Sequence, residues 1–101
     1  MPQDELYDPV ERFLTIIKGK RKAAIIIYIN DGIKRYNELR KELSDVSERI
    51  LIKQLKDLER EGIIEKKTYP EVPPRVEYRL TEKGSTLCPI IKKMWKWGVD
   101  N

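Results

Sequence analysis

The stretch SERILIKQLKDLEREGIIEKKTYPEVPPRVEYRL, from Ser47 to Leu80, contains the two patterns that decide the fold. Its first part predicts a helix over 47–61, because leucines recur at the spacing of one helix face and Gly62 follows as a natural helix end. Its second part predicts a β-hairpin with strands over 63–68 and 76–80. Three prolines in five positions stiffen the loop between these strands.

The segments before this stretch predict three more helices. Pro9 suits the first turn of a helix over 9–18, apolar residues follow at helical spacing, and Gly19 ends it. We expect residues 1–8 to be flexible. The run AAIIIYI within 20–30 fits either a buried strand or a buried helix, and the length of the segment favours a helix. A short strand over 33–35 and a short helix over 36–43 then lead into the long helix.

The end of the chain predicts a last helix over 81–98. Thr81 is a suitable N-cap, and Glu82 places a negative charge at the positive end of the helix dipole. Pro89 lies inside this segment, so we expect a kink or an offset start. The fold class is therefore α+β in a single domain: a helix-turn-helix over 36–61, a wing hairpin over 63–80, and flanking helices at both ends.

The composition excludes several classes of protein. The chain has 101 residues, a net charge of +4, one cysteine and no histidine. These features remove the usual hydrolytic triads, most transition-metal sites and internal disulfides, so we expect no cofactor and no enzymatic activity. The longest apolar run, over 23–29, is far too short to cross a membrane. We therefore expect a cytoplasmic protein with no membrane partner.

The helix over 47–61 carries a stripe of positive charge. With its leucines facing the core, the opposite side presents Arg49, Lys53, Lys56 and Arg60. Such a stripe fits a recognition helix in the major groove of DNA, where arginine pairs with guanine and Gln54 would pair with adenine. A solvated helix face without a partner is the simpler interpretation of the stripe alone.

Three motifs give the chain a family resemblance. They are RYNELR from Arg35, the pattern S-x-R-x-L-x-x-Q-L from Ser47, and YPEVPPRVEY from Tyr69. With them, the chain from DPVERFLTIIKGKRK to the terminal WKWG resembles the HxlR family of winged-helix transcriptional regulators, relatives of the MarR-like group. The resemblance implies a homodimer that binds double-stranded DNA at a roughly palindromic operator. It also implies that AAIIIYI forms a helix.

The resemblance assigns expected roles to three groups of residues. Those on the recognition helix are Ser47, Arg49, Lys53, Gln54, Lys56 and Arg60. Those on or near the wing are Arg75, Lys67, Tyr36 and Asn37. Those at the dimer interface are Phe13, Leu14, Ile91, Met94 and Trp95, on the first and last helices. The proline loop would present Arg75 outward to the minor groove or a phosphate, and its pairing with Glu71 or Glu77 is the alternative.

Two positions depart from the family pattern. Many members have a cysteine before PVER, and in several it senses redox state, whereas this chain has Asp8 there. Arg21 stands where an aromatic residue is common, and it could alter packing or add a phosphate contact. Cys88 is better explained as a small buried residue than as a sensor. The sequence identifies no small-molecule effector. A winged-helix module that binds proteins and a non-specific architectural DNA binder are the rival functions.

Overall fold

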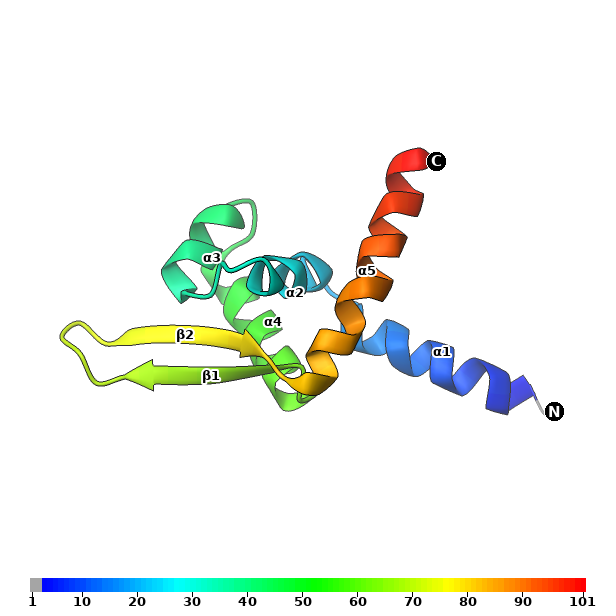
Figure 1. Ribbon diagram of the computed structural model, residues 1–101, viewed down its shortest axis with the longest axis horizontal. Coiled ribbons are helices and arrows are strands. Elements are labelled where there is room, and N and C mark those ends of the chain that lie inside the picture. Colours follow the sequence, from blue (N-terminus) through cyan, green and yellow to red (C-terminus); the bar gives the residue numbers. More distant parts are fainter. Residues whose placement is uncertain (1–2) are drawn as a thin grey trace.

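The computed structural model describes residues 3–101, with side chains from Asp8 onward, and confirms the predicted order of elements (Figure 1). The elements are α1 (Gln3–Ile17), α2 (Lys22–Asn30), α3 (Tyr36–Glu42), α4 (Glu48–Arg60), β1 (Ile64–Tyr69), β2 (Arg75–Leu80) and α5 (Glu82–Asp100). The two strands form one antiparallel sheet, so the chain is a mixed α+β protein. Among these elements no helix is long and apolar enough to cross a membrane.

The ambiguous run AAIIIYI is the central helix α2. Ile25, Ile26 and Ile29 are at most 2% exposed, and α2 contacts α4, β2 and α5. A helix enclosed from several directions buries apolar residues around most of its surface, which removes the amphipathic pattern that identifies a surface helix. This packing explains why periodicity alone did not distinguish the helix from a strand.

The helix-turn-helix is held by a cap and a leucine core. Ser47 caps α4 because its Oγ accepts a hydrogen bond from the backbone N–H of Ile50, at 3.2 Å. Leu39 and Leu43 from the α3 region join three leucines of α4 in the buried core. These are Leu51, Leu55 and Leu58, each at most 2% exposed.

The hairpin is paired closer to its tip than the sequence suggested. Its register runs from Ile64 opposite Leu80 to Tyr69 opposite Arg75, so the proline loop is shorter than we expected. The predicted short strand over 33–35 is wrong: the segment before α3 makes only a single antiparallel bridge, Arg35 opposite Glu77, beside which the N–H of Tyr78 donates to the carbonyl of Lys34 at 2.8 Å. This contact attaches the base of the wing to the start of the helix-turn-helix.

The helix α5 begins where expected and continues through Pro89 without a break, so the offset start was wrong. Thr81 caps it, with its Oγ1 accepting from the N–H of Gly84 at 3.0 Å. A Cβ atom at Gly84 would lie 2.1 Å from the carbonyl oxygen of Ile63. The first turn of α5 therefore packs directly on the chain that leads into β1.

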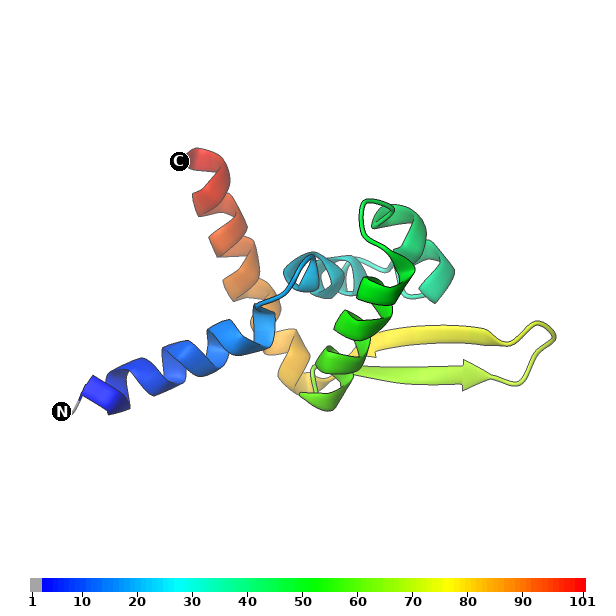
Figure 2. The ribbon, with the colours of Figure 1, turned by 180° about the vertical axis from the view of Figure 1, so that it is seen from behind.

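The helix α1 is longer than the sequence suggested. It begins at Gln3 and contains Pro9, whereas we expected a flexible segment over 1–8 and a start at Pro9. Proline removes a single backbone donor, and no other proline or glycine interrupts residues 3–17, so the helix continues through it. Residues 1–2 lie outside the described residues. Both α1 and the end of α5 extend away from the body of the molecule, as the view from behind confirms (Figure 2).

Candidate nucleic-acid interface

The outer face of α4 carries the four basic residues that the sequence placed there. Arg49, Lys53, Lys56 and Arg60 are all exposed. Arg49 and Lys56 form no ion pair with any residue from Asp8 onward. Their charges are therefore available to a phosphate or a base edge.

The other two cations are held by one acid, Asp57. Its carboxylate lies 3.0 Å from Lys53 Nζ and 3.4 Å from Arg60 Nη1. A third cation, Lys22 of α2, reaches the same carboxylate at 3.4 Å from the buried side. The hydrogen bond from Lys53 is the main cause that lowers the pKa of Asp57, and the charge of Lys22 adds to it. Asp57 lies at the flank of the basic face, and its charge offsets part of the stripe.

Gln54 does not face DNA, and its assignment as a base-reading residue was wrong. It is 5% exposed, and its Nε2 donates to the carbonyl of Lys20 at 3.3 Å. Gly19 lies against it, since a Cβ there would come within 2.9 Å of Gln54 Nε2. The sequence contained the signal, because Gln54 stands three residues after Leu51 and four before Leu58, on the core face of the helix.

The residues at the start of α3 lie beside the recognition helix and the wing. Tyr36 is half-buried, and its hydroxyl donates to Glu48 Oε1 at 2.9 Å. Burial and the neighbouring Glu48 raise the pKa of Tyr36. Asn37 is exposed and lines a small groove of about 310 Å³ between α3 and the wing tip. Tyr36 thus supports α4, whereas Asn37 is open to a partner.

The wing does not present Arg75 outward, so that expectation was wrong. The guanidinium lies 4.0 Å from the centre of the Tyr69 ring, with Glu71 3.2 Å from Nη2 and Glu77 3.4 Å from Nε. The Nε atom is buried and its contact with Glu77 is an ion pair without hydrogen-bond geometry. Arg75 faces Tyr69 across the hairpin, and Glu77 is two residues along on the same face of the strand.

Other wing residues are more accessible. Lys67 is exposed, with its Nζ 4.9 Å from the Tyr69 ring. Val72, at the tip, is fully exposed. We overlooked Val72 in the sequence, although the prolines on either side of it mark the tip of the loop. The tip of the wing therefore presents exposed Val72 beside the acidic Glu71, with positive charge set back along β1.

The proposed dimer residues fall into two groups. Leu14, Met94 and Trp95 are 41%, 45% and 70% exposed, and Phe13 is half-buried against the core. Ile91 is only 4% exposed and belongs to the core, so its assignment to the interface was wrong. Other exposed apolar residues on the same two helices are Val10, Ile90, Trp97 and Val99.

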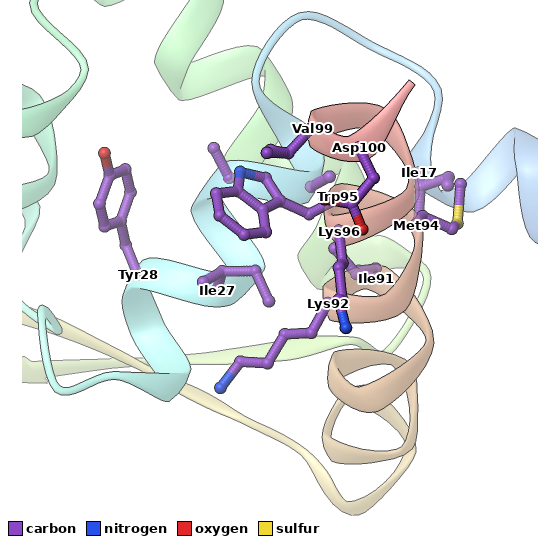
Figure 3. Close-up of a pocket in the computed structure, with 12 residues that line it drawn as sticks. Ile17, Ile27, Tyr28, Ile91, Lys92, Met94, Trp95, Lys96, Val99 and Asp100 are labelled. Carbon is purple, nitrogen blue, oxygen red and sulfur yellow. The ribbon is translucent and has the colours of Figure 1, made fainter.

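A groove of about 980 Å³ runs between α2 and α5. Apolar side chains of both helices line most of it, and Ile17 of α1 contributes at one end. Figure 3 shows the Trp95 ring extending from α5 over α2, with Lys92 and Lys96 also on the α5 side. The groove and the exposed residues of α1 and α5 make one end of the molecule strongly apolar.

Comparison with known proteins agrees with the resemblance. Residues 16–101 match the model of the HxlR-like helix-turn-helix family. The chain belongs to the HxlR family. The HTH-type transcriptional regulator YdeP of Bacillus subtilis (strain 168) is 49% identical over 90 residues, covering 89% of this chain and 70% of YdeP. A transcriptional regulator of Methanothermobacter thermautotrophicus is 40% identical over 98 residues, covering 97% of this chain and 75% of that protein.

Solved structures of HxlR-type and MarR-type regulators have the same fold. The redox regulator HypR in its oxidised form superposes with a TM-score of 0.85 at 45% identity, covering 92% of this chain and 96% of HypR. A MarR-family regulator of Porphyromonas gingivalis W83 gives 0.85 at 47% identity, covering 92% of this chain and 91% of that one. This HxlR-family chain is thus a winged-helix transcriptional regulator with a DNA-binding helix-turn-helix, and not an enzyme.

The structure gives Arg21 and Cys88 each an internal role. Arg21 forms an ion pair with Asp45 in the turn between α3 and α4, and this pair lowers the pKa of Asp45. Arg21 therefore joins the α1–α2 turn to the helix-turn-helix and is already paired. Cys88 is 4% exposed, and burial raises the pKa of its thiol, which disfavours the reactive thiolate.

Proposed function

We propose that this regulator acts in the cytoplasm as a homodimer on a roughly palindromic operator. Each α4 would enter the major groove, and each hairpin would contact the minor groove or the phosphates. The observation that supports this proposal best is the exposed face of α4, where Arg49 and Lys56 have no acidic partner from Asp8 onward.

We assign the residue roles as follows. Arg49, near the capped end of α4, would read a base edge, since arginine makes two hydrogen bonds to guanine. Lys56, Lys67 and Asn37 would contact the backbone of the duplex. Ser47 keeps a helix-capping role and sits where α4 would approach a phosphate. Lys53 and Arg60 would contribute only after leaving Asp57.

The apolar end of the molecule supports the homodimer. Exposed Leu14, Met94 and Trp95, together with the groove beside α2, form an apolar surface that water would otherwise cover. A second copy would bury this surface and bring two α4 helices to one side of the duplex. Half-sites would then lie about 34–36 Å apart, one helical turn of DNA.

A footprint on the DNA upstream of the protein's own gene and its neighbours tests the proposal. We expect a discrete palindromic footprint that resists scrambled competitor and weakens as salt is raised. Binding that depends on salt but shows no sequence preference would favour an architectural role. An absence of binding at low salt would overturn the DNA proposal, and the apolar surface would then point to a protein partner.

A further inference from the structure

The four cations of α4 form two pairs with different surroundings. Arg49 and Lys56 face solvent without an acidic partner from Asp8 onward. Lys53 and Arg60 lie 3.0 and 3.4 Å from the two oxygens of Asp57. Half of the cations of the stripe are therefore already paired with an acid in the protein without DNA.

Asp57 is itself fixed from inside the molecule. Lys22 of α2 is 6% exposed and places its Nζ 3.4 Å from Asp57 Oδ2. A buried ammonium needs a charged partner, because leaving it unpaired is strongly destabilising. The Asp57 carboxylate is 21% exposed and cannot leave this position without exposing Lys22 to that penalty. The acid is thus a permanent feature of the DNA-facing helix.

We infer that Asp57 limits the non-specific affinity of α4 for DNA. This inference rests on the proposed function. Non-specific binding depends on the number of phosphates that cations neutralise, and a cation shared with a fixed carboxylate contributes less to that number. The ion pairs of Lys53 and Arg60 are exposed and individually weak, so a well-placed operator phosphate could still replace them at small cost.

A lower non-specific affinity matters because non-specific DNA sites are so numerous. A genome offers about 10⁶–10⁹ of them, and they compete with a single operator for the same protein molecules. A regulator that binds any duplex less tightly leaves more molecules free to find the operator. Asp57 is in this sense a specificity-determining residue that acts on the competing sites.

The test is a fluorescence titration of a scrambled duplex, at several salt concentrations between about 50 and 200 mM, with four proteins. They are the unaltered chain, Asp57→Asn, the double variant Lys22→Met/Asp57→Asn, and Glu59→Gln. Glu59 is exposed on the same helix and forms no ion pair with a residue from Asp8 onward, so Glu59→Gln changes the net charge as Asp57→Asn does. The double variant keeps the original net charge and leaves no buried lysine unpaired.

We expect both Asp57→Asn proteins to bind the scrambled duplex several-fold more tightly, with a salt slope steeper by about one to two units. Glu59→Gln should change the affinity by about twofold or less, because a single exposed charge is well screened at this salt. If Asp57→Asn fails to fold, the double variant decides the question.

Equal gains for Asp57→Asn and Glu59→Gln, or no gain in the double variant, would overturn the inference while leaving the proposed function intact. If the unaltered chain binds neither the scrambled duplex nor its operator, the proposed function fails, and this inference fails with it.

Discussion

The recognition helix and the wing both place basic side chains near acids, but the result differs. On α4 one carboxylate, Asp57, pairs with two of the four cations, and these two, Lys53 and Arg60, are still 68% and 74% exposed. On the wing a single arginine, Arg75, meets two carboxylates and an aromatic ring, and it is 32% exposed. The first arrangement leaves charge for a partner, whereas the second uses the charge to hold the hairpin tip together.

This difference between α4 and the wing shows that a pattern of positive residues in a sequence does not by itself indicate which charges are available to a partner. A sequence places the cations, yet their availability depends on acids that the fold brings near. Helical spacing revealed that Arg49 and Lys56 face outward, but strand pairing decided that Arg75 faces Tyr69. Four predictions test this contrast between available and internally paired charge.

The largest effect should follow removal of an available cation. Arg49→Ala should weaken operator binding by about 1–3 kcal/mol and relax the preference at one base position, because the lost group reads a base edge. Titration against a panel of single-base operator variants measures both quantities. Equal weakening on every variant would show that Arg49 contacts only the backbone.

Removal of the paired wing arginine should affect folding more than binding. Arg75→Ala removes the contact with Tyr69 and both ion pairs, so we expect it to lower the unfolding free energy by about 1 kcal/mol. For a domain of this size that corresponds to a fall of about 4–8 °C in Tm, measured by thermal unfolding. The salt slope of DNA binding should stay unchanged, and a slope lower by one unit would instead make Arg75 a phosphate contact.

Two lysines of α4 compare available and paired charge directly. Lys56→Ala should weaken binding to all duplexes alike and lower the salt slope by about one unit, because one phosphate contact is lost. Lys53→Ala removes the same type of side chain from the same face, but Asp57 already pairs with it. The salt slope of DNA binding should therefore fall less for Lys53→Ala than for Lys56→Ala. Equal losses would contradict the division of the stripe into two pairs.

The smallest expected effect is on thermal stability at low pH. The pKa of Asp57 is below its ordinary value of 3.8 in the folded chain, so folding favours the ionised form. The stability that this carboxylate contributes is present above that ordinary value and is lost as pH falls through the lower folded value. Between about pH 5 and pH 2, Tm should therefore fall less steeply for Asp57→Asn than for the unaltered chain. If Tm falls equally with pH for the two proteins in this range, the result would argue against the ion pairs of Asp57.

Much of the fold could be predicted from local patterns. Capping residues, leucine spacing and prolines marked the helices and the hairpin because these signals act between near neighbours in the chain. The direction of Gln54 was available from the same spacing and was missed, because its chemistry suggested DNA. Ile91 was misassigned for another reason: the apolar side of the end of α5 is broad, and only the position of α2 shows which part of it is covered.

The exposed end of α5 has a consequence for experiment. The only two tryptophans in the sequence, Trp95 and Trp97, both lie there, each 70% exposed, and far along the chain from α4 and the hairpin. The tryptophan fluorescence of this protein therefore arises entirely from its apolar end. A blue shift of the emission with rising protein concentration would report self-association without any label, and it would do so independently of the DNA-facing helix.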